Sequence, residues 1–559
     1  SLGQSFIEGI VSDNRGEIPF ANIEIKEIQI GTAADAKGYF KLEIPAGNYI
    51  IEISAMGYHK FKKKIELIEG RTFFIEPVLA ETSYSIDQVV VTGTLKESFV
   101  KVSPVKVEVI SSTFLKKTPT NNLMEIIETV NGVQKQINCG VCGTSDIHIN
   151  GMEGSYSLIL IDGMPIMSSL STVYGLNGIP TSLIRQIEII KGPSSTLYGT
   201  EAVAGVINII THHPEDLSKF QFESFVSSDR EKNMDLSWSP KWKKANMLLS
   251  ANLFHMNHFM DENGDGFADE VLSERGSLFN KWTLYRPSKK AMDLTAKYYF
   301  EERFGGIESW TQEYRGSDSI YGEAITTNRL EFSSRYELPS DENMVLQTSY
   351  NYHKQDSYYG ETHYKATQNT LFNQLLWYKD TGLRHELTTG ITLKFNSYND
   401  NTPATKETDL FHIPGIFVQD EFTLSDQWKI LSGIRWDRHQ DHGNIFAPSF
   451  NLKWAPNINT SFRWNVGTGF RVVNLFTEDH TALSGSREVI IANNLQPEES
   501  KNINFNFNHW FQRNEQNTSL DIDLFYTHFT NKIIPDYDTD PSKIFYDNLK
   551  GYSISKGAS

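Results

Sequence analysis

A short acidic segment, Asp261-Glu262-Asn263-Gly264-Asp265-Gly266-Phe267-Ala268-Asp269, has the oxygen spacing of a calcium-binding loop. In such loops, side-chain oxygens at positions 1, 3, 5 and 9 and the carbonyl at position 7 surround the ion, and glycine at position 6 allows a sharp turn. The ligands here would be Asp261, Asn263, Asp265, Asp269 and the carbonyl of Phe267. Position 12 is Leu272 instead of glutamate, so Glu270 or Glu274 would have to complete the shell. We expect Ca²⁺ at this loop; the alternative is a solvated acidic loop.

The two cysteines of the chain, Cys139 and Cys142, form a C-x-x-C pair that four kinds of chemistry use. Redox catalysis needs a βαβ context, which the surrounding sequence lacks. Structural zinc needs two further ligands, and only Asp146 and His148 are near in sequence. A contact to a soft metal or haem at a substrate site is a third interpretation, because thiolates select soft ions. A disulfide is the fourth, and it requires an oxidising compartment.

Composition narrows the class of protein. The chain of 559 residues carries a net charge of -17, which argues against nucleic-acid binding because that needs a basic face. No apolar run approaches the roughly 18 residues of a membrane helix, whereas membrane strands stay compatible because their alternating side chains average out in hydropathy. No catalytic constellation or ATP-binding signature occurs, so we expect neither an enzyme nor an organic cofactor.

The first part of the chain is predicted to contain three segments. Residues 1–82 alternate apolar and polar side chains in short runs between turn residues, which predicts a small β-sandwich. Residues 83–94 are a β-branched run of the kind that a partner's sheet edge can capture as an added strand. Residues 95–214 mix strands with a helix over 121–130, which Thr118 or Thr120 would cap.

The pattern of polar and apolar residues changes after residue 214. Segments of about ten residues alternate polar and apolar side chains and end in aromatics, as at 278–285, 385–395 and 502–510. The connections alternate between short (341–343, 425–427) and long (255–276, 302–325, 471–498). This pattern is typical of membrane β-barrels, and the number of strands and the loop asymmetry count against a soluble sandwich.

Residues 146–211 carry a long family signature. It begins with Asp146-Ile147-His148-Ile149-Asn150-Gly151 and Leu160-Ile161-Asp162-Gly163-Met164-Pro165, and it ends in Ala204-Gly205-Val206-Ile207-Asn208-Ile209-Ile210-Thr211. Between them stands Ile184-Arg185-Gln186-Ile187-Glu188-Ile189-Ile190-Lys191-Gly192-Pro193-Ser194-Ser195-Thr196-Leu197-Tyr198-Gly199. This run closely resembles the plug domain of TonB-dependent outer-membrane receptors. Val418-Gln419-Asp420-Glu421, Gly433-Ile434-Arg435-Trp436-Asp437, Phe470-Arg471 and Asn494-Leu495-Gln496-Pro497-Glu498 are similar to that family's barrel, and Gly31-Thr32 through Gly57-Tyr58 resemble a carboxypeptidase-regulatory-like domain.

The resemblance implies a mainly β fold of four parts. These are a β-sandwich (1–82), a TonB box (83–94), an α+β plug (95–214) and a transmembrane antiparallel β-barrel (215–559). Family barrels have 22 strands around a plugged lumen, whereas 215–559 accommodates about 15 or 16 at ~10 residues each. We therefore expect roughly six or seven C-terminal strands to be absent and a leader peptide to have been removed. The implied location is the outer membrane of a Gram-negative bacterium, where a disulfide between Cys139 and Cys142 is the expected state.

The resemblance also implies binding residues. Residues Ile86, Asp87, Gln88, Val89, Val90, Val91 and Thr92 stand where the family binds TonB, and we expect the segment 86–93 to be mobile until capture. Met164 and Met167 lie near the plug's substrate-facing apex, with packing methionines as the alternative. His148 and His480 are further candidate substrate contacts. His480 lies where haem receptors of the family carry a ligand, although Phe470-Arg471 continues here as Val472-Val473.

The implied function is TonB-driven import of a scarce nutrient, above all a metal chelate such as a siderophore complex, haem or cobalamin. The expected partners are TonB with its inner-membrane motor, outer-membrane lipid and the small-molecule ligand. Two alternatives differ in class: a glycan or peptide importer that works with a surface lipoprotein, and a signalling or adhesion receptor that transports nothing.

Overall fold

The computed structural model describes residues 4–13, 16–25, 28, 30–35, 37–55, 58, 61–79, 89–118, 120, 122–165, 178–288, 290–382, 384–402, 405, 407–473, 487–492, 495–513 and 516–559. The chain divides into two compact units: residues 1–90 with 97–102, and residues 91–96 with 103–559. None of the described helices is long and apolar enough to cross a membrane.

The first unit is a β-sandwich, as predicted. One sheet has the order β4 (Tyr39–Pro45), β1 (Gln4–Ile10), β7 (Thr72–Ile75), and the other β3 (Ile30–Ala33), β2 (Asn22–Ile25), β5 (Gly47–Ser54), β6 (Phe61–Leu67). Ile7 and Phe40 from the first sheet and Ile23, Ile51 and Ile65 from the second are buried in one core. Alternating side chains on both sheets therefore close a single apolar layer. A short pair, β8 (Val89–Val90) with β9 (Ser98–Phe99), follows.

The plug, here the elements from β10 to η4, is built around a five-stranded sheet. Its order is β10 (Glu108–Ser111), β15 (Ile184–Lys191), β16 (Gly205–Thr211), β13 (Ser157–Ile161), β14 (Met164–Pro165). A separate hairpin joins β11 (Val133–Cys139) to β12 (Thr144–Ile149). Among the described residues of the plug, the helices are α1 (Ser112–Lys117), α2 (Leu123–Ile127) and α4 (Ser195–Tyr198), with 3₁₀ turns η1 (Gly154–Tyr156), η3 (Thr181–Leu183) and η4 (Pro214–Asp216). Every residue of β13 and β16 is buried, as expected of paired parallel strands covered on both faces.

The helix predicted over 121–130 is shorter than expected. α2 ends at Ile127, and residues 128–130 continue only as hydrogen-bonded turns. Its cap is Asn122, whose side-chain oxygen accepts the N–H of Met124 at 3.1 Å, so the prediction of Thr118 or Thr120 is wrong. Thr120 instead accepts the N–H of Asn122.

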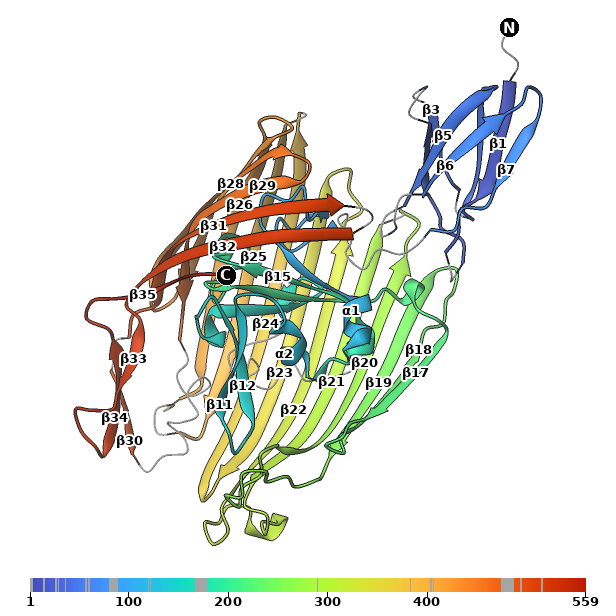
Figure 1. The fold of residues 1–559 in the computed structure, drawn as a ribbon. Coiled ribbons are helices and arrows are strands. Elements are labelled where there is room, and N and C mark those ends of the chain that lie inside the picture. Colours follow the sequence, from blue (N-terminus) through green and yellow to red (C-terminus); the bar gives the residue numbers. More distant parts are fainter. Residues whose placement is uncertain are drawn as a thin grey trace. The chain divides into compact units, whose positions relative to one another are not determined.

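A 16-stranded antiparallel sheet, the barrel sheet, forms the rest of this unit and curves around the plug (Figure 1). Its strands are β17 (Phe220–Val226), β18 (Lys232–Trp238), β19 (Ala245–Met256), β20 (Leu272–Tyr285), β21 (Ala291–Gly306), β22 (Gly322–Glu337), β23 (Asn343–Tyr359), β24 (Thr362–Thr381), β25 (His385–Asp400), β26 (Asp409–Thr423), β27 (Trp428–His439), β28 (Gly443–Asn457), β29 (Thr460–Arg471), β31 (Glu498–Arg513), β32 (Gln516–Thr530) and β35 (Tyr552–Ala558). A small sheet of β30 (Glu488–Ile491), β34 (Lys543–Asn548) and β33 (Ile533–Asp536) and the 3₁₀ turn η5 (Gln312–Tyr314) lie in its connections.

The barrel sheet reverses the usual distribution of polarity. Many buried positions that face the plug side are polar or charged, among them Asn252, Lys281, Lys297, Arg329 and Gln355. The positions between them expose large apolar side chains, among them Leu253, Leu278, Tyr298, Leu330, Ile416, Val418, Ile434 and Ile503. Strict alternation along each strand produces both faces at once.

Connections differ between the two ends of the barrel sheet. One end carries the connections 257–271, 307–321 and 472–497, and we call it the long-loop end. The other carries 338–342, 382–384, 424–427 and 458–459, and we call it the short-turn end. The hairpin β11–β12 of the plug points toward the long-loop end (Figure 1).

Candidate functional site

Polar contacts and apolar clusters both join the plug to the barrel sheet, and one of the polar contacts is a charged junction at Asp162. Asp162 lies in the turn between β13 and β14, where its carboxylate accepts the N–H and hydroxyl of Thr211 at 2.8 and 2.7 Å. Lys281 of β20 donates to the same carboxylate at 2.9 Å. Burial alone would raise the pKa of Asp162, but the Lys281 ammonium and the Thr211 hydrogen bonds hold it below its ordinary value. The junction is therefore a charged hydrogen-bond cluster that keeps Asp162 ionised.

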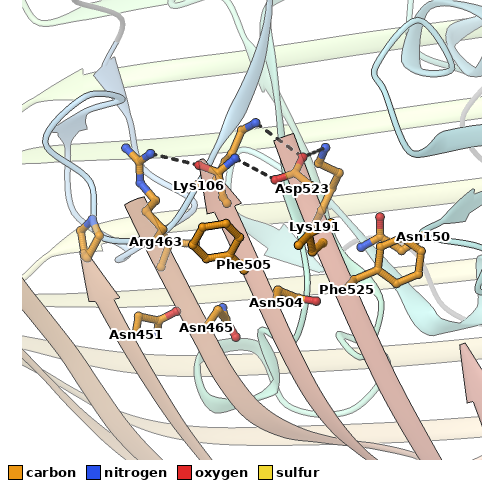
Figure 2. Close-up of a pocket in the computed structure, with 14 residues that line it drawn as sticks. Lys106, Asn150, Lys191, Asn451, Arg463, Asn465, Asn504, Phe505, Asp523 and Phe525 are labelled. Atoms are coloured by element: carbon orange, nitrogen blue, oxygen red, sulfur yellow. Dashed lines mark hydrogen bonds and ion pairs between the residues drawn. The ribbon is translucent and has the colours of Figure 1, made fainter. Parts of the chain in front are cut away.

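A second polar junction lies between the plug and strands β29, β31 and β32, around a small pocket (Figure 2). Lys191 of β15 contacts Asp523 of β32 at 2.5 Å, and Lys106 contacts the same carboxylate at 3.6 Å. Asn506 links them to Arg463, since it donates to Asp523 at 2.8 Å and accepts from the guanidinium at 3.3 Å.

The carboxylates of this junction form one of two groups of possible metal ligands among the described residues. Glu108, Asp521 and Asp523 bring their oxygens within 4.8 Å of one another. Lys106 pairs with all three and Lys191 with two of them. Burial alone would raise the pKa of Glu108, but these ammonium groups lower it. The three carboxylates are thus already paired with protein cations, and the group acts as an ion-pair network.

An open cavity lies on the plug side of the barrel sheet, toward the long-loop end. Lys394 and Glu201, which pair at 3.3 Å, form part of its lining. His439 and His442 contribute imidazole rings whose centroids are 4.6 Å apart, and Phe411 packs on His439. Burial lowers the pKa of His442, which leaves its ring neutral at neutral pH. Neutral imidazoles, an aromatic ring and a paired charge can bind a polar or metal-bearing small molecule.

These two histidines were not among the residues predicted from the sequence. The run His439-Gln440-Asp441-His442 offered a signal, because it places two imidazoles within one short turn between alternating strands. Nothing in the sequence, however, indicated that Glu201 of the plug and Lys394 of β25 would meet at the same cavity.

The expected TonB-binding segment is docked where the structure describes it. Residues Ile86, Asp87 and Gln88 lie outside the described residues. The N–H groups of Val91 and Thr92 and the hydroxyl of Thr92 all donate to one oxygen of Glu188, at 3.0, 2.9 and 2.5 Å. Asn208 donates to the Thr92 hydroxyl, and Tyr198 donates to the Thr92 carbonyl. The expectation of a mobile segment is therefore wrong for Val91 and Thr92, because a buried carboxylate satisfies their donors.

Cys139 and Cys142 are free thiols in this structure, so the expected disulfide is not formed here. The N–H of Cys142 donates to the sulfur of Cys139 at 3.2 Å, and the Cys139 thiol donates to Glu323 of β22 at 3.3 Å. Hydrogen bonds from Cys142 lower the pKa of Cys139, while the thiol of Cys142 has a raised pKa. The structure thus places a barrel carboxylate beside the C-x-x-C pair, in place of the expected Asp146 and His148.

The remaining predicted substrate contacts have different outcomes. Met164 is 3% exposed and packs in the plug core, which fits the packing alternative and does not fit a substrate-facing position. His148 lies on β12 and contacts Asp146 at 3.0 Å, and this hydrogen bond raises the pKa of His148. Met167 and His480 lie outside the described residues. Substrate contacts by His148, Met167 and His480 stay predictions.

The acidic loop 261–269 folds around its own side chains. Asp261 accepts the N–H groups of Gly264 and Gly266 at 2.7 and 2.9 Å, and Asp269 accepts that of Glu262 at 2.6 Å. Gly264 and Gly266 have φ values of +74° and +86°, as the turns of a calcium loop require. The possible metal-ligand groups among the described residues do not include this loop. Calcium binding by this loop stays a prediction. To bind the ion, the carboxylates would have to give up their hydrogen bonds to backbone N–H groups.

A polar-lined sheet curved around an internal domain, apolar on its other face, defines the class of plugged β-barrel receptors. The family described as TonB dependent receptor-like, beta-barrel matches residues 236–559, and the TonB-dependent Receptor Plug Domain matches residues 100–206. A CarboxypepD_reg-like domain matches residues 7–91. The chain therefore belongs to the TonB-dependent receptor family.

Characterised relatives of this chain agree with the family assignment. The chain is 26% identical over 458 residues to the iron-regulated outer membrane virulence protein of Vibrio cholerae, covering 78% of this chain and 67% of the relative. It is 24% identical over 394 residues to the vitamin B12 transporter BtuB of Vibrio vulnificus (69% and 63%) and 23% identical over 488 residues to the ferric enterobactin receptor PirA of Pseudomonas aeruginosa (73% and 64%). The chain thus spans about two thirds of the length of these relatives.

Solved structures agree on the fold. The siderophore receptor PirA from Pseudomonas aeruginosa has a TM-score of 0.62 at 20% identity, with 81% of this chain and 80% of that chain covered. The ferric enterobactin receptor PfeA has a TM-score of 0.63 at 17% identity, with 81% and 77% covered. At these identities the likeness concerns the fold alone.

Proposed function

We propose that this receptor imports a metal chelate, either an iron–siderophore complex or cobalamin, across the outer membrane of a Gram-negative bacterium. One observation carries the proposal: a cavity at the long-loop end lies between the plug and the barrel sheet. His439, His442 and Lys394 are among the residues that line it. The relatives named for iron, enterobactin and vitamin B12 supply the substrate class.

The exterior of the barrel sheet supports a membrane location. Its exposed apolar side chains match a lipid-facing band. Stacked tryptophans, Trp242 on Trp282 and Trp428 on Trp454, gather near the short-turn end as one aromatic girdle would. The short-turn end then faces the periplasm and the long-loop end the medium.

TonB is the proposed energy source and partner, and the segment 86–92 is its proposed binding strand. Its described residues carry the β-branched pattern of a strand that a partner can add to its own sheet. Calcium at Asp261, Asn263, Asp265, Phe267 and Asp269 belongs to the same proposal as a stabiliser of an outer loop.

Uptake by a receptor-deletion strain tests the proposal. Cells that carry the full-length receptor should accumulate labelled iron–siderophore or cobalamin, and Val90→Pro should abolish uptake but keep surface binding, because proline removes a main-chain donor from the added strand. Val90→Ile, which keeps the N–H, is the matched control. Uptake of oligosaccharides or peptides, with neither chelate accepted, would instead establish the glycan or peptide alternative.

A further inference from the structure

We propose that Cys139, Cys142 and Glu323 bind a thiophilic divalent metal ion, with Zn²⁺ as the best match, and that the ion ties the plug hairpin β11–β12 to barrel strand β22. The inference does not depend on the imported substrate. It concerns a resident ion at the boundary between two elements, near the long-loop end.

The three side chains already converge. The sulfur of Cys139 lies 3.3 Å from Oε2 of Glu323, and the three ligand atoms of Cys139, Cys142 and Glu323 all lie within 4.8 Å of one another. In a tetrahedral zinc site with two sulfur ligands and one oxygen ligand, ligand atoms lie roughly 3.5–3.8 Å apart. Small side-chain adjustments therefore suffice, and three protein ligands leave the fourth position for water.

The cluster of Cys139, Cys142 and Glu323 contains a buried carboxylate that a bound cation would neutralise. Glu323 is 3% exposed, and its other oxygen accepts the hydroxyl of Tyr321 at 2.7 Å. Among the described residues, no lysine or arginine forms an ion pair with Glu323. Other buried glutamates on the plug side of the barrel sheet have such partners: Glu301 pairs with Arg303, Glu331 with Arg329 and Lys297, and Glu498 with Arg471. A buried carboxylate beside two thiols gains its missing counter-charge from a bound metal.

Two glycines hold the hairpin turn in place. A Cβ atom at Gly305, at the end of β21, would lie 1.5 Å from the carbonyl oxygen of Val141. Gly143 has a φ of +61°, and a Cβ there would lie 2.1 Å from Val271. The turn between Cys139 and Cys142 thus packs directly against the barrel sheet. This packing positions the two thiols in the absence of a metal ion. Such preorganisation is what a metal site needs.

Binding requires no redox partner. Each thiol releases one proton and forms one metal–sulfur bond, while the Glu323 carboxylate adds an oxygen bond without changing its charge. A disulfide would use the same two sulfurs and would leave Glu323 without a cation, so the two states exclude each other.

Metal titration of the full-length receptor in detergent tests the proposal. After reduction and removal of metal by a chelator, Zn²⁺ should bind one per chain and protect both thiols from alkylation, whereas Ca²⁺ should not. Co²⁺ in place of Zn²⁺ should give a thiolate-to-metal absorption band. The chain has no other cysteine, so the band reports on this pair.

Three variants sharpen the test. Glu323→Gln should weaken Zn²⁺ binding by at least about tenfold, whereas Glu308→Gln, which changes an exposed carboxylate in the neighbouring connection, should leave it unchanged. Gly305→Ala should also weaken binding, because it displaces the hairpin while both thiols remain. Zinc affinity that is unaffected by Glu323→Gln would overturn the proposed site. So would a Cys139–Cys142 disulfide, with no bound metal, in receptor isolated without reductant; this measurement uses the unaltered chain.

Discussion

Glu188 is a buried carboxylate that accepts hydrogen bonds from the side-chain amide of Gln186 and from backbone and hydroxyl donors of Val91 and Thr92. It is 1% exposed, and one oxygen accepts from Val91, from Thr92 and from the Thr92 hydroxyl. Hydrogen bonds to an ionised acceptor contribute about 1.5–3 kcal/mol each, more than neutral ones. The residue therefore fixes the end of the proposed TonB-binding segment on the plug, and TonB would have to compete with it for the same main-chain donors.

We predict that Glu188→Ala releases this segment. Amide hydrogen exchange of Val91 and Thr92 should become about ten- to a hundredfold faster, as the loss of about 1.5–3 kcal/mol of local stability implies. Glu188→Gln should have a smaller effect, because its amide oxygen can still accept. Exchange-detected mass spectrometry of the peptide around residues 89–95 measures the change. Equal exchange in all three proteins would show that Glu188 does not hold the segment.

Residue contacts of this kind could not be predicted from sequence. Glu188 and Thr92 are 96 residues apart, Lys281 and Asp162 are 119 apart, and Glu323 and Cys139 are 184 apart. Local spacing suggested Asp146 and His148 as partners of the cysteines, but β12 turns these two side chains toward each other. Met164 packs in the plug core, as the packing alternative for this position near the apex predicted.

At the scale of secondary-structure elements, the periodicity of apolar residues predicted the strands better than the sequence predicted residue contacts. The strands expected at 278–285 and 385–395 lie within β20 and β25. Their lengths were underestimated, since β24 has 20 residues against the expected ten or so. The expected length was that of a typical membrane strand, whereas β24 pairs along most of its length with both β23 and β25. The helix at 121–130 was overestimated because its apolar spacing continues into turns that are no longer helical.

The acidic loop between β19 and β20 is an element whose ligand can be tested directly. We predict that millimolar Ca²⁺ raises the protection of residues 261–269 against proteolysis, because the ion would replace weak amide contacts with bonds of about 2.3–2.6 Å. Asp265→Asn should lower the affinity for Ca²⁺, and Asp318→Asn in the next long connection should not. Calorimetric titration of both variants measures this. If saturating Ca²⁺ did not change the proteolysis of residues 261–269, the calcium prediction would be wrong and the alternative of a solvated acidic loop would hold.

At the scale of the whole molecule, two kinds of core coexist. The plug has an apolar core that includes Ile126, Ile159, Ile187 and Ile207, whereas its boundary with the barrel sheet combines ion pairs and hydrogen bonds with smaller apolar clusters. The family resemblance predicted this division into parts, because a long motif specifies the plug and alternation specifies the sheet. It did not predict which charges meet across the boundary. The polar part of this boundary reduces the apolar surface that the plug would expose if it shifted.

The last prediction concerns that boundary. Asp162→Asn keeps the side-chain shape but leaves the buried Lys281 ammonium without its carboxylate. We expect a loss of about 3 kcal/mol, the low end for a buried pair, because the Asp162 side chain is 25% exposed. Since the pKa of Asp162 is lowered, its contribution is present above the ordinary carboxyl pKa and is lost as the pH falls through the lowered value. The plug of the wild-type receptor should therefore lose stability in acid through this group, and the variant should lack that component.

Hydrogen exchange in increasing denaturant measures the effect, read from plug peptides in β15 and β16 and from barrel peptides in β23 and β24. In Asp162→Asn, plug protection should fall at lower denaturant than in the wild type, with barrel protection unchanged, because the altered contact lies only at the boundary. Asp216→Asn, an exposed carboxylate of the same plug, is the matched control. If plug and barrel peptides lost protection together in every variant, the two would unfold as one cooperative unit, and a separately movable plug would have to be abandoned.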